Sequence, residues 1–189
     1  MNEKLNKPSA LDADDGNILV LVNRNNLISR SYTPVDMVAV QGTERLIKRS
    51  AHIAYLKMKA DALAEGLDFY IDSAYRSYST QERLFIAGGG ERSKVCAPPG
   101  ASEHHTGLAV DILTLTLKKG PYRRFFQTPE YRWLCDHCAD YGFIIRYPYG
   151  KTHITGYDWE PWHFRYVGRE TAAEITKRKI TLEEYLNDA

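Results

Sequence analysis

Apolar positions recur along the chain with two different periods, which predicts a mixture of helices and strands. Residues 44–65 carry apolar side chains at helical spacing, and Gly66 provides a natural helix stop. Residues 69–73 alternate in the manner of a half-buried strand. Further strands are expected at residues 18–23, 107–113, 143–146 and 162–167, and further helices at residues 77–86 or 79–86, 128–141, 170–179 and 182–186.

Capping residues indicate where two of these helices begin. Either Ser77 or Ser79 could accept a hydrogen bond from the first turn of the helix that follows. Thr128 combines a cap with a first-turn proline, and Gly142 ends that helix. Because helices and strands do not alternate in a βαβαβ rhythm, the chain is predicted to be α+β, with a small antiparallel sheet flanked by helices.

Length and composition fit one soluble domain and exclude several classes of protein. The chain has 189 residues, which predicts a flexible lead-in at residues 1–16 and a single domain at residues 17–189. Its 25 basic and 24 acidic residues give 25 − 24 = +1, far from the strong basic field of a dedicated nucleic-acid binder. Three cysteines are too few, and odd in number, for a disulfide scaffold. Thirteen tyrosines supply flat rings with polar tips, which suit the wall of a groove.

The start of the chain carries neither a membrane span nor a signal-peptide pattern. The longest strongly apolar run there covers residues 18–22, well short of the ~20 residues that a membrane helix needs. Residues 1–17 are polar and charged. As written, the chain is therefore expected to be cytoplasmic, or to belong to the cell envelope if an N-terminal anchor or signal has been removed.

Two short segments hold the densest polar chemistry, residues 102–111 and 160–163. His104, Asp111 and His163 offer two imidazoles and one carboxylate, a set suited to a catalytic zinc ion with one open position. Glu160 lies three residues before His163 and could accept a proton from an attacking water. A single histidine or aspartate is more often structural than metal-binding, so spacing alone leaves the metal site open.

These two segments resemble the paired signature of the LAS metallopeptidases, which include lysostaphin-type enzymes, D-Ala-D-Ala carboxypeptidases and Hedgehog-like domains. The motifs are Ser102-x-His104-x-x-Gly107-x-Ala109-x-Asp111 and Glu160-x-Trp162-His163. The VanY, VanXY and LdcB branch is the more similar one, with matching segments at residues 18–23, 74–78 and 148–168. The resemblance covers most of the chain and implies a single Hedgehog/DD-peptidase-like domain.

The resemblance also implies roles around one catalytic centre. By matching position, the resemblance implies that His104, Asp111 and His163 are the Zn²⁺ ligands. It implies that Glu160 is the general base and acid and that Arg76 stabilises the oxyanion. It also implies that Ser102 and Gln81 bind the terminal carboxylate of the substrate. Arginine suits the oxyanion because its fixed fork meets charge that arises only in the transition state. Tyr147 is a candidate for the wall of the substrate groove, whereas His105 is expected not to bind metal.

The implied activity is a zinc D,D-carboxypeptidase or dipeptidase that acts on a D-Ala-terminated peptide or peptidoglycan stem. Three alternatives stay open: an L,D-carboxypeptidase on tetrapeptide stems, a phage-type L-alanyl-D-glutamate endolysin, and a non-catalytic zinc binding module. An endolysin has no use for the carboxylate ligands Ser102 and Gln81, and a structural zinc has no use for the base Glu160. Two departures from the family, Ala74 in place of the usual glycine and a short segment at residues 84–100, leave the preferred substrate length undecided.

Two other polar clusters are predicted to be structural. Residues 135–138 contain a single CxxC with one histidine inside a helix, which favours buried apolar thiols over a second metal site. Residues 118–124 hold two basic pairs next to aromatic rings, which favour a solvated loop over a nucleic-acid site.

Overall fold

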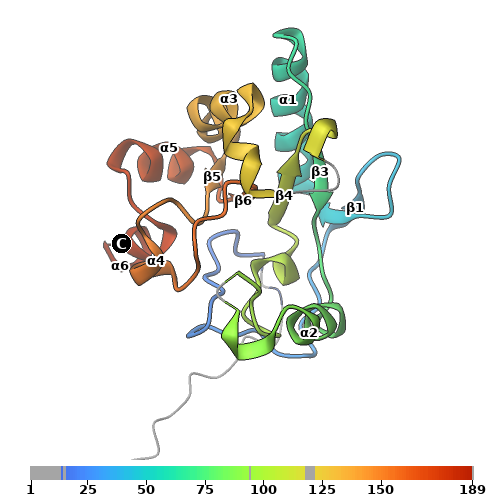
Figure 1. The fold of residues 1–189 in the computed structure, drawn as a ribbon, viewed down its shortest axis with the longest axis vertical. Helices are drawn as coiled ribbons and strands as arrows, with labels where there is room; N and C mark the ends of the chain where they lie inside the picture. Colours follow the sequence, from blue (N-terminus) through green and yellow to red (C-terminus); the bar gives the residue numbers. More distant parts are fainter. Residues whose placement is uncertain (1–13, 15, 94, 118–121, 189) are drawn as a thin grey trace, which may run out of the picture.

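The computed structural model describes residues 14, 16–93, 95–117 and 122–188, which form a mixed helix and sheet domain (Figure 1). Its main sheet has four antiparallel strands in the order β3-β4-β6-β5, and β1 pairs with β2 in a separate ribbon. The strands are β1 Met37–Ala39, β2 Leu46–Lys48, β3 Tyr70–Ser73, β4 Ala109–Leu113, β5 Phe143–Ile145 and β6 His163–Tyr166. The predicted α+β class is confirmed.

Helices surround this sheet, with α1 and α3 at the top of Figure 1, α5 and α6 at the left and α2 at the bottom. The α-helices are α1 Arg49–Ala64, α2 Tyr78–Ala87, α3 Pro129–His137, α4 Thr152–Thr155, α5 Arg169–Arg178 and α6 Leu182–Asp188. Short 3-10 helices are η1 Gly90–Arg92, η2 Glu103–Thr106, η3 Leu115–Leu117, η4 Tyr122–Gln127 and η5 Cys138–Tyr141. No α-helix among the described residues is long and apolar enough to cross a membrane.

The core lies where α1 and α3 pack on the central strands. Every residue of β4 is buried, and Met58 of α1, Leu134 of α3 and Phe164 of β6 belong to the same cluster of buried side chains. Each buried side chain of this size stabilises the fold by about 1.5–3 kcal/mol relative to its exposed state. The two central strands, β4 and β6, are thereby held rigidly, and both carry candidate site residues.

Both predicted caps are formed by side chains. The Ser77 hydroxyl accepts a hydrogen bond from the amide of Thr80 at 3.2 Å, which settles the choice between the two serines. Thr128 accepts from the amide of Tyr131 at 3.2 Å. The sequence patterns did not predict α4 or the β1–β2 ribbon.

One predicted strand is absent, and one predicted helix begins later than expected. Residues 18–23 form no strand, because the carbonyls of Ile18 and Val20 accept hydrogen bonds from the Arg165 guanidinium, at 2.9 and 2.8 Å, in place of a strand partner. The helix predicted from residue 44 begins at residue 49, because residues 46–48 pair with β1 and the amide of Lys48 donates to the carbonyl of Gly107. In both places a long-range partner overrides the local apolar pattern.

The end of the predicted lead-in is tied to the domain. The Asp14 carboxylate lies 2.5 Å from the Lys48 ammonium and accepts a hydrogen bond from the amide of Val35 at 2.8 Å. This charge pair connects Asp14 to β2. Residues 1–13 and residue 15 lie outside the described residues.

Gly107 forms the turn between η2 and β4 and has a left-handed φ of 71°. A Cβ built there would lie 3.3 Å from the amide nitrogen of Lys48 and 2.6 Å from the methyl carbon of Met37. Both the conformation and the space therefore favour glycine. This explains why the turn that joins His104 to Asp111 contains a glycine.

Replacing Gly107 by alanine is expected to lower the free energy of unfolding by about 1–3 kcal/mol, because alanine is strained at positive φ and crowds β2. Denaturant unfolding of the variant gives this loss directly. Gly150→Ala is the matched control, since Gly150 has φ 82° with open space around the added carbon. An equal loss in the two variants would show that the contacts with Met37 and Lys48 contribute nothing.

Candidate metal centre and catalytic cavity

Pairing of the two central strands brings the two signature segments together. Asp111 of β4 lies opposite His163, the first residue of β6, in the antiparallel register. His104 belongs to η2, directly before β4, and Arg76 follows β3, the other neighbour of β4. Residues 52 positions apart in the chain thus become hydrogen-bonding neighbours.

The three predicted ligands converge on one point. Oδ1 of Asp111 lies 3.2 Å from Nδ1 of His163 and 3.3 Å from Nε2 of His104. Ligand atoms at the corners of a tetrahedron around zinc lie about 3.3 Å apart when each metal–ligand distance is about 2.0 Å. Ligand atoms of all three residues lie within 4.8 Å of one another, and the three side chains are buried.

The donor atoms also have the chemistry that zinc requires. Nδ1 of His104 lies 2.6 Å from the carbonyl oxygen of Ala74 and donates to it, so Nε2 carries the lone pair. That Nε2 is buried and has no hydrogen-bond partner among the described residues. A buried polar atom without a partner is costly, and a metal ion removes that cost. The residues present therefore fit Zn²⁺.

Burial and mutual contact shift the pKa values of these groups strongly. Burial, with a further contribution from the nearby Arg76, lowers the pKa of His104 to about 4. Burial alone would lower the pKa of His163, but hydrogen bonds and charge from Asp111 and Glu103 raise it to about 9. Burial alone would raise the pKa of Asp111, yet the two histidines hold it well below its usual range. The site thus holds its carboxylate ligand ionised.

Glu160 points into the same space from the loop before β6. Its Oε2 lies 3.8 Å from Nδ1 of His163, and its buried Oε1 has no hydrogen-bond partner among the described residues. Burial raises the pKa of Glu160 to about 8, against the opposing charge of His163. A divalent cation on the neighbouring ligands would lower this pKa and favour the proton-accepting carboxylate.

Arg76 faces the ligands from the β3 side. One guanidinium nitrogen donates to Oε1 of Gln81 at 3.0 Å, and another lies 3.3 Å from Oδ2 of Asp111. The buried Nε has no partner among the described residues. Gln81 is fully buried, and its amide nitrogen donates to the carbonyl of Ala97 at 2.8 Å. Gln81 therefore links Arg76 to Ala97, which also lines the cavity.

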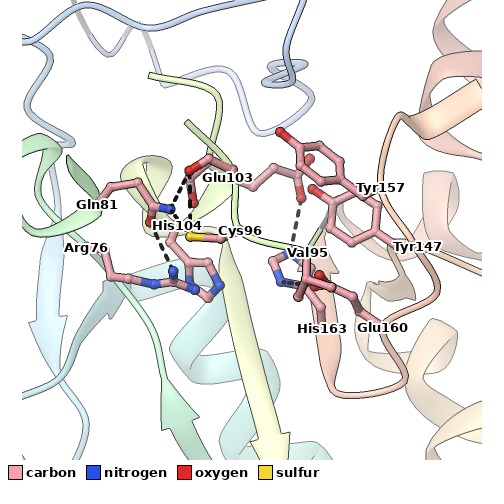
Figure 2. Close-up of a pocket in the computed structure, with 12 residues that line it drawn as sticks. Arg76, Gln81, Val95, Cys96, Glu103, His104, Tyr147, Tyr157, Glu160 and His163 are labelled. Carbon is pink, nitrogen blue, oxygen red and sulfur yellow. Dashed lines mark hydrogen bonds and ion pairs between the residues drawn. The ribbon is translucent and has the colours of Figure 1, made fainter. Parts of the chain in front are cut away.

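A small cavity opens beside these groups, and Figure 2 shows Arg76, Gln81 and His104 across it from Tyr147 and Glu160. Every predicted site residue lines this cavity except Asp111, which contacts three of the others. The lining residues are Arg76, Gln81, Val95, Cys96, Ala97, Ser102, Glu103, His104, Tyr147, Tyr157, Glu160 and His163. The cavity is thus the place where the implied roles would be combined.

Two of the predicted substrate contacts have different surroundings. The Tyr147 ring lies 4.9 Å from the His163 ring and 4.9 Å from the Tyr157 ring, so it packs against a predicted ligand as well as lining the cavity. The Ser102 hydroxyl makes no hydrogen bond to another residue within the described part of the chain. It is therefore available to a bound molecule.

Sequence reasoning missed Glu103 and Tyr157 as parts of the cavity, and from the segment 84–100, which the resemblance places beside the groove, it singled out no residue. Glu103 was the unspecified position of a motif, and its only signal was an acidic residue directly before a predicted ligand. Cys96 is a half-buried free thiol whose pKa burial raises. The placement of Glu103 depends on the distant residues Arg146 and Arg165, whereas Cys96 is placed by the fold of the segment 84–100.

The residues predicted to be outside the site are placed as follows. His105 lies in η2, and both of its ring nitrogens face backbone groups, the carbonyl of Arg76 at 2.7 Å and the amide of Gly100 at 3.2 Å. Cys135 and Cys138 are free, and burial raises the pKa of both thiols. Arg123 lies 3.7 Å from Asp158, while Lys118 and Lys119 lie outside the described residues.

Comparison with known proteins gives one consistent result. Residues 44–169 match the family model described as VanY, D-alanyl-D-alanine carboxypeptidase. The putative carboxypeptidase YodJ of Bacillus subtilis is 39% identical over 182 residues, which cover 89% of this chain and 67% of that protein. The chain spans 58% and 65% of the length of D-alanyl-D-alanine carboxypeptidases from Enterococcus faecium and Enterococcus faecalis.

Two solved structures are similar across nearly the whole domain. The LdcB LD-carboxypeptidase superposes with a TM-score of 0.84 at 38% identity, covering 94% of this chain and 90% of that one. A VanY D,D-pentapeptidase from a VanB-type vancomycin resistance cassette, in complex with Zn(II), superposes with a TM-score of 0.77 at 33% identity, covering 89% and 98%. These likenesses agree with the zinc-type ligand set found here.

Proposed function

The chain belongs to the VanY family of D-alanyl-D-alanine carboxypeptidases, and we propose that it is a zinc-dependent hydrolase that removes C-terminal D-alanine from peptidoglycan precursors or stem peptides. One observation carries this proposal. His104, Asp111 and His163 converge with metal-ligand spacing, and Glu160 lies against them in the same buried cavity. A binding module would have no use for an unpartnered buried carboxylate beside its metal.

The proposed reaction divides its work between the metal and the chain. Bound zinc supplies a Lewis acid that favours attack of water on a peptide carbonyl. Glu160 accepts the proton of the attacking water on its free Oε1 and then delivers it to the nitrogen of the leaving D-alanine. Burial suits both steps, because a raised pKa makes the carboxylate a stronger base toward the water and keeps the proton on the carboxyl until the leaving nitrogen accepts it.

Arg76 is proposed to stabilise the oxyanion that forms when the carbonyl is attacked. Gln81 and Asp111 hold its guanidinium in place, so its charge is oriented before the reaction begins. Gln81 uses both ends of its amide within the protein, and this favours a part in orienting Arg76. Direct contact of Gln81 with the substrate carboxylate stays a prediction.

Ser102 is the better-supported ligand of the terminal carboxylate, because its hydroxyl lines the cavity without another partner in the described chain. Ser102→Ala is expected to raise KM about tenfold for a D-Ala-terminated peptide with a free carboxylate, since a hydrogen bond to a charged group is lost. The same variant should change KM little for the C-terminally amidated peptide. Ser50→Ala, on the exposed face of α1, is the matched control. Equal effects on both peptides would remove the carboxylate-reading role.

A second candidate function is an L,D-carboxypeptidase that acts on tetrapeptide stems. The superposition favours it, since the LdcB LD-carboxypeptidase fits with a TM-score of 0.84 and the VanY D,D-pentapeptidase with 0.77. The zinc-loaded protein should be given D-Ala-D-Ala, a pentapeptide stem, a tetrapeptide stem and intact cell wall, with D-alanine release followed. Release from the pentapeptide supports the D,D activity, and release from the tetrapeptide alone supports the L,D activity. Cleavage only within wall stems would indicate an endolysin.

A further inference from the structure

Glu103 is a buried carboxylate that the proposed reaction does not use. It lies in η2 directly before His104 and is 1% exposed. Transferring an ionised carboxylate into a protein interior is very unfavourable unless the charge is paired and hydrogen-bonded. A charged Glu103 beside the metal centre therefore requires partners for its carboxylate. Its two oxygens, Oε1 and Oε2, face different groups.

Oε1 of Glu103 is held by two arginines. It accepts hydrogen bonds from Nε of Arg146 at 2.7 Å and from Nη1 of Arg165 at 2.8 Å, and both arginines are fully buried. The two guanidinium groups offset the cost of burying the carboxylate, and their hydrogen bonds fix it in position.

Oε2 of Glu103 points toward the second histidine ligand. It lies 3.5 Å from Nε2 of His163, and neither atom has a hydrogen-bond partner among the described residues (Figure 2). The opposite ring nitrogen, Nδ1, faces Oδ1 of Asp111 at 3.2 Å. The imidazole of His163 is therefore bracketed by one carboxylate on each side.

We propose that Glu103 is a positioning residue for the metal: its Oε2 accepts the Nε2 proton of His163, which leaves the lone pair on Nδ1 for the ion. His104 shows the same arrangement with the ring reversed, since its Nδ1 donates to the carbonyl of Ala74 and Nε2 faces the site. Partners of this kind fix the tautomer and the ring orientation of metal-binding histidines. The inference rests on the ligand set of the proposed function.

The network continues to the end of the chain and explains why Glu103 does not move. Both terminal nitrogens of Arg146 donate to the carboxylate of Glu183 in α6, at 2.9 and 2.6 Å. Arg165 donates to the carbonyls of Ile18 and Val20. This buried network therefore contains two arginines and the carboxylates of Glu103 and Glu183, and of these two carboxylates Glu103 is the one that contacts His163.

The test is zinc affinity, measured by competition with a chromophoric chelator, for the wild type and for Glu103→Gln. Glu103→Gln is expected to bind zinc about 10–100-fold more weakly, because the amide no longer fixes the Nε2 proton. Glu183→Gln is the matched control: it removes one charge from the same network but leaves the contact with His163. It should lower the melting temperature while keeping wild-type zinc affinity.

A second readout follows the tautomer itself. In zinc-loaded wild type, ¹⁵N NMR of the imidazoles should show His163 protonated at Nε2 and His104 protonated at Nδ1, and the His163 pattern should change in Glu103→Gln. If the glutamine variant does not fold, Glu103→Asp keeps the charge for the arginines and shortens the reach toward His163. The aspartate variant should then lose zinc affinity as well.

The outcomes separate this inference from the proposed function. The positioning role would be overturned, with the ligand set left intact, if Glu103→Gln kept wild-type zinc affinity and unchanged His163 signals. If Glu103→Gln does not fold, the same result in Glu103→Asp would overturn it. Zinc that does not shift the His163 signals of the wild type would overturn both. Equal zinc loss in Glu103→Gln and Glu183→Gln would show that the network acts only through overall stability, which also contradicts the proposal.

Discussion

Glu160→Gln is expected to reduce kcat for D-alanine release by about 10²–10⁴-fold, the usual contribution of a positioned general base. The amide is nearly the same size as the carboxylate, so the cavity keeps its shape, but it can neither accept the water's proton nor return one to the leaving amine. Oε1 of Glu160 is buried and has no hydrogen-bond partner among the described residues, so the substitution breaks no hydrogen bond of that oxygen. The measurement is steady-state D-alanine release by zinc-loaded protein.

Two further measurements make that result specific. Zinc stoichiometry should stay at one per chain in Glu160→Gln, because the three ligands are untouched. Glu170→Gln makes the same change on the exposed first turn of α5 and should leave kcat unchanged. Turnover of Glu160→Gln near the wild-type rate would exclude Glu160 as the base, whatever the metal content.

His163→Ala is expected to lose both zinc and activity. The substitution removes one of three ligands and also leaves the buried carboxylates of Asp111 and Glu103 facing each other without the imidazole between them. Loss of a residue that supports a metal ligand lowers metal affinity by about 10–100-fold, and loss of the ligand itself should lower zinc affinity by more than that. Metal content after dialysis and D-alanine release are both measured.

His153→Ala supplies the comparison for that variant. His153 lies in α4 with an exposed side chain, and its removal should change neither zinc content nor turnover. Retention of one zinc per chain in His163→Ala would show that the metal is bound elsewhere, and the ligand set would be wrong.

The convergence of the site could be predicted because two short motifs resemble the paired signature of a metallopeptidase family, whereas their residue types and spacing alone left the metal site open. His104, Glu160 and His163 line one cavity, and Asp111 contacts both histidines beside it. The physical cause of their convergence, the pairing of Asp111 with His163 across two strands, follows once both segments are expected to be strands of one antiparallel sheet. Fold class and caps were predictable for a similar reason, since the signals that set them are local.

What sequence could not show depends on distant partners. Glu103 is an acidic residue that any surface loop could carry, and it becomes part of the site only through Arg146 and Arg165, which lie 43 and 62 residues away. The apolar run at residues 18–23 has the pattern of a strand. Its carbonyls at Ile18 and Val20 instead accept hydrogen bonds from Arg165, which lies 147 and 145 residues further along the chain. No local pattern encodes such contacts.

The most direct test of the central claim is D-alanine release from a stem peptide by metal-free protein as zinc is added back. Release should be absent without zinc, rise with added metal and saturate at one zinc per chain. The C-terminally amidated peptide should be cleaved far more slowly under the same conditions. Release that is independent of zinc, or equal on the amidated peptide, would contradict a zinc-dependent carboxypeptidase at this site.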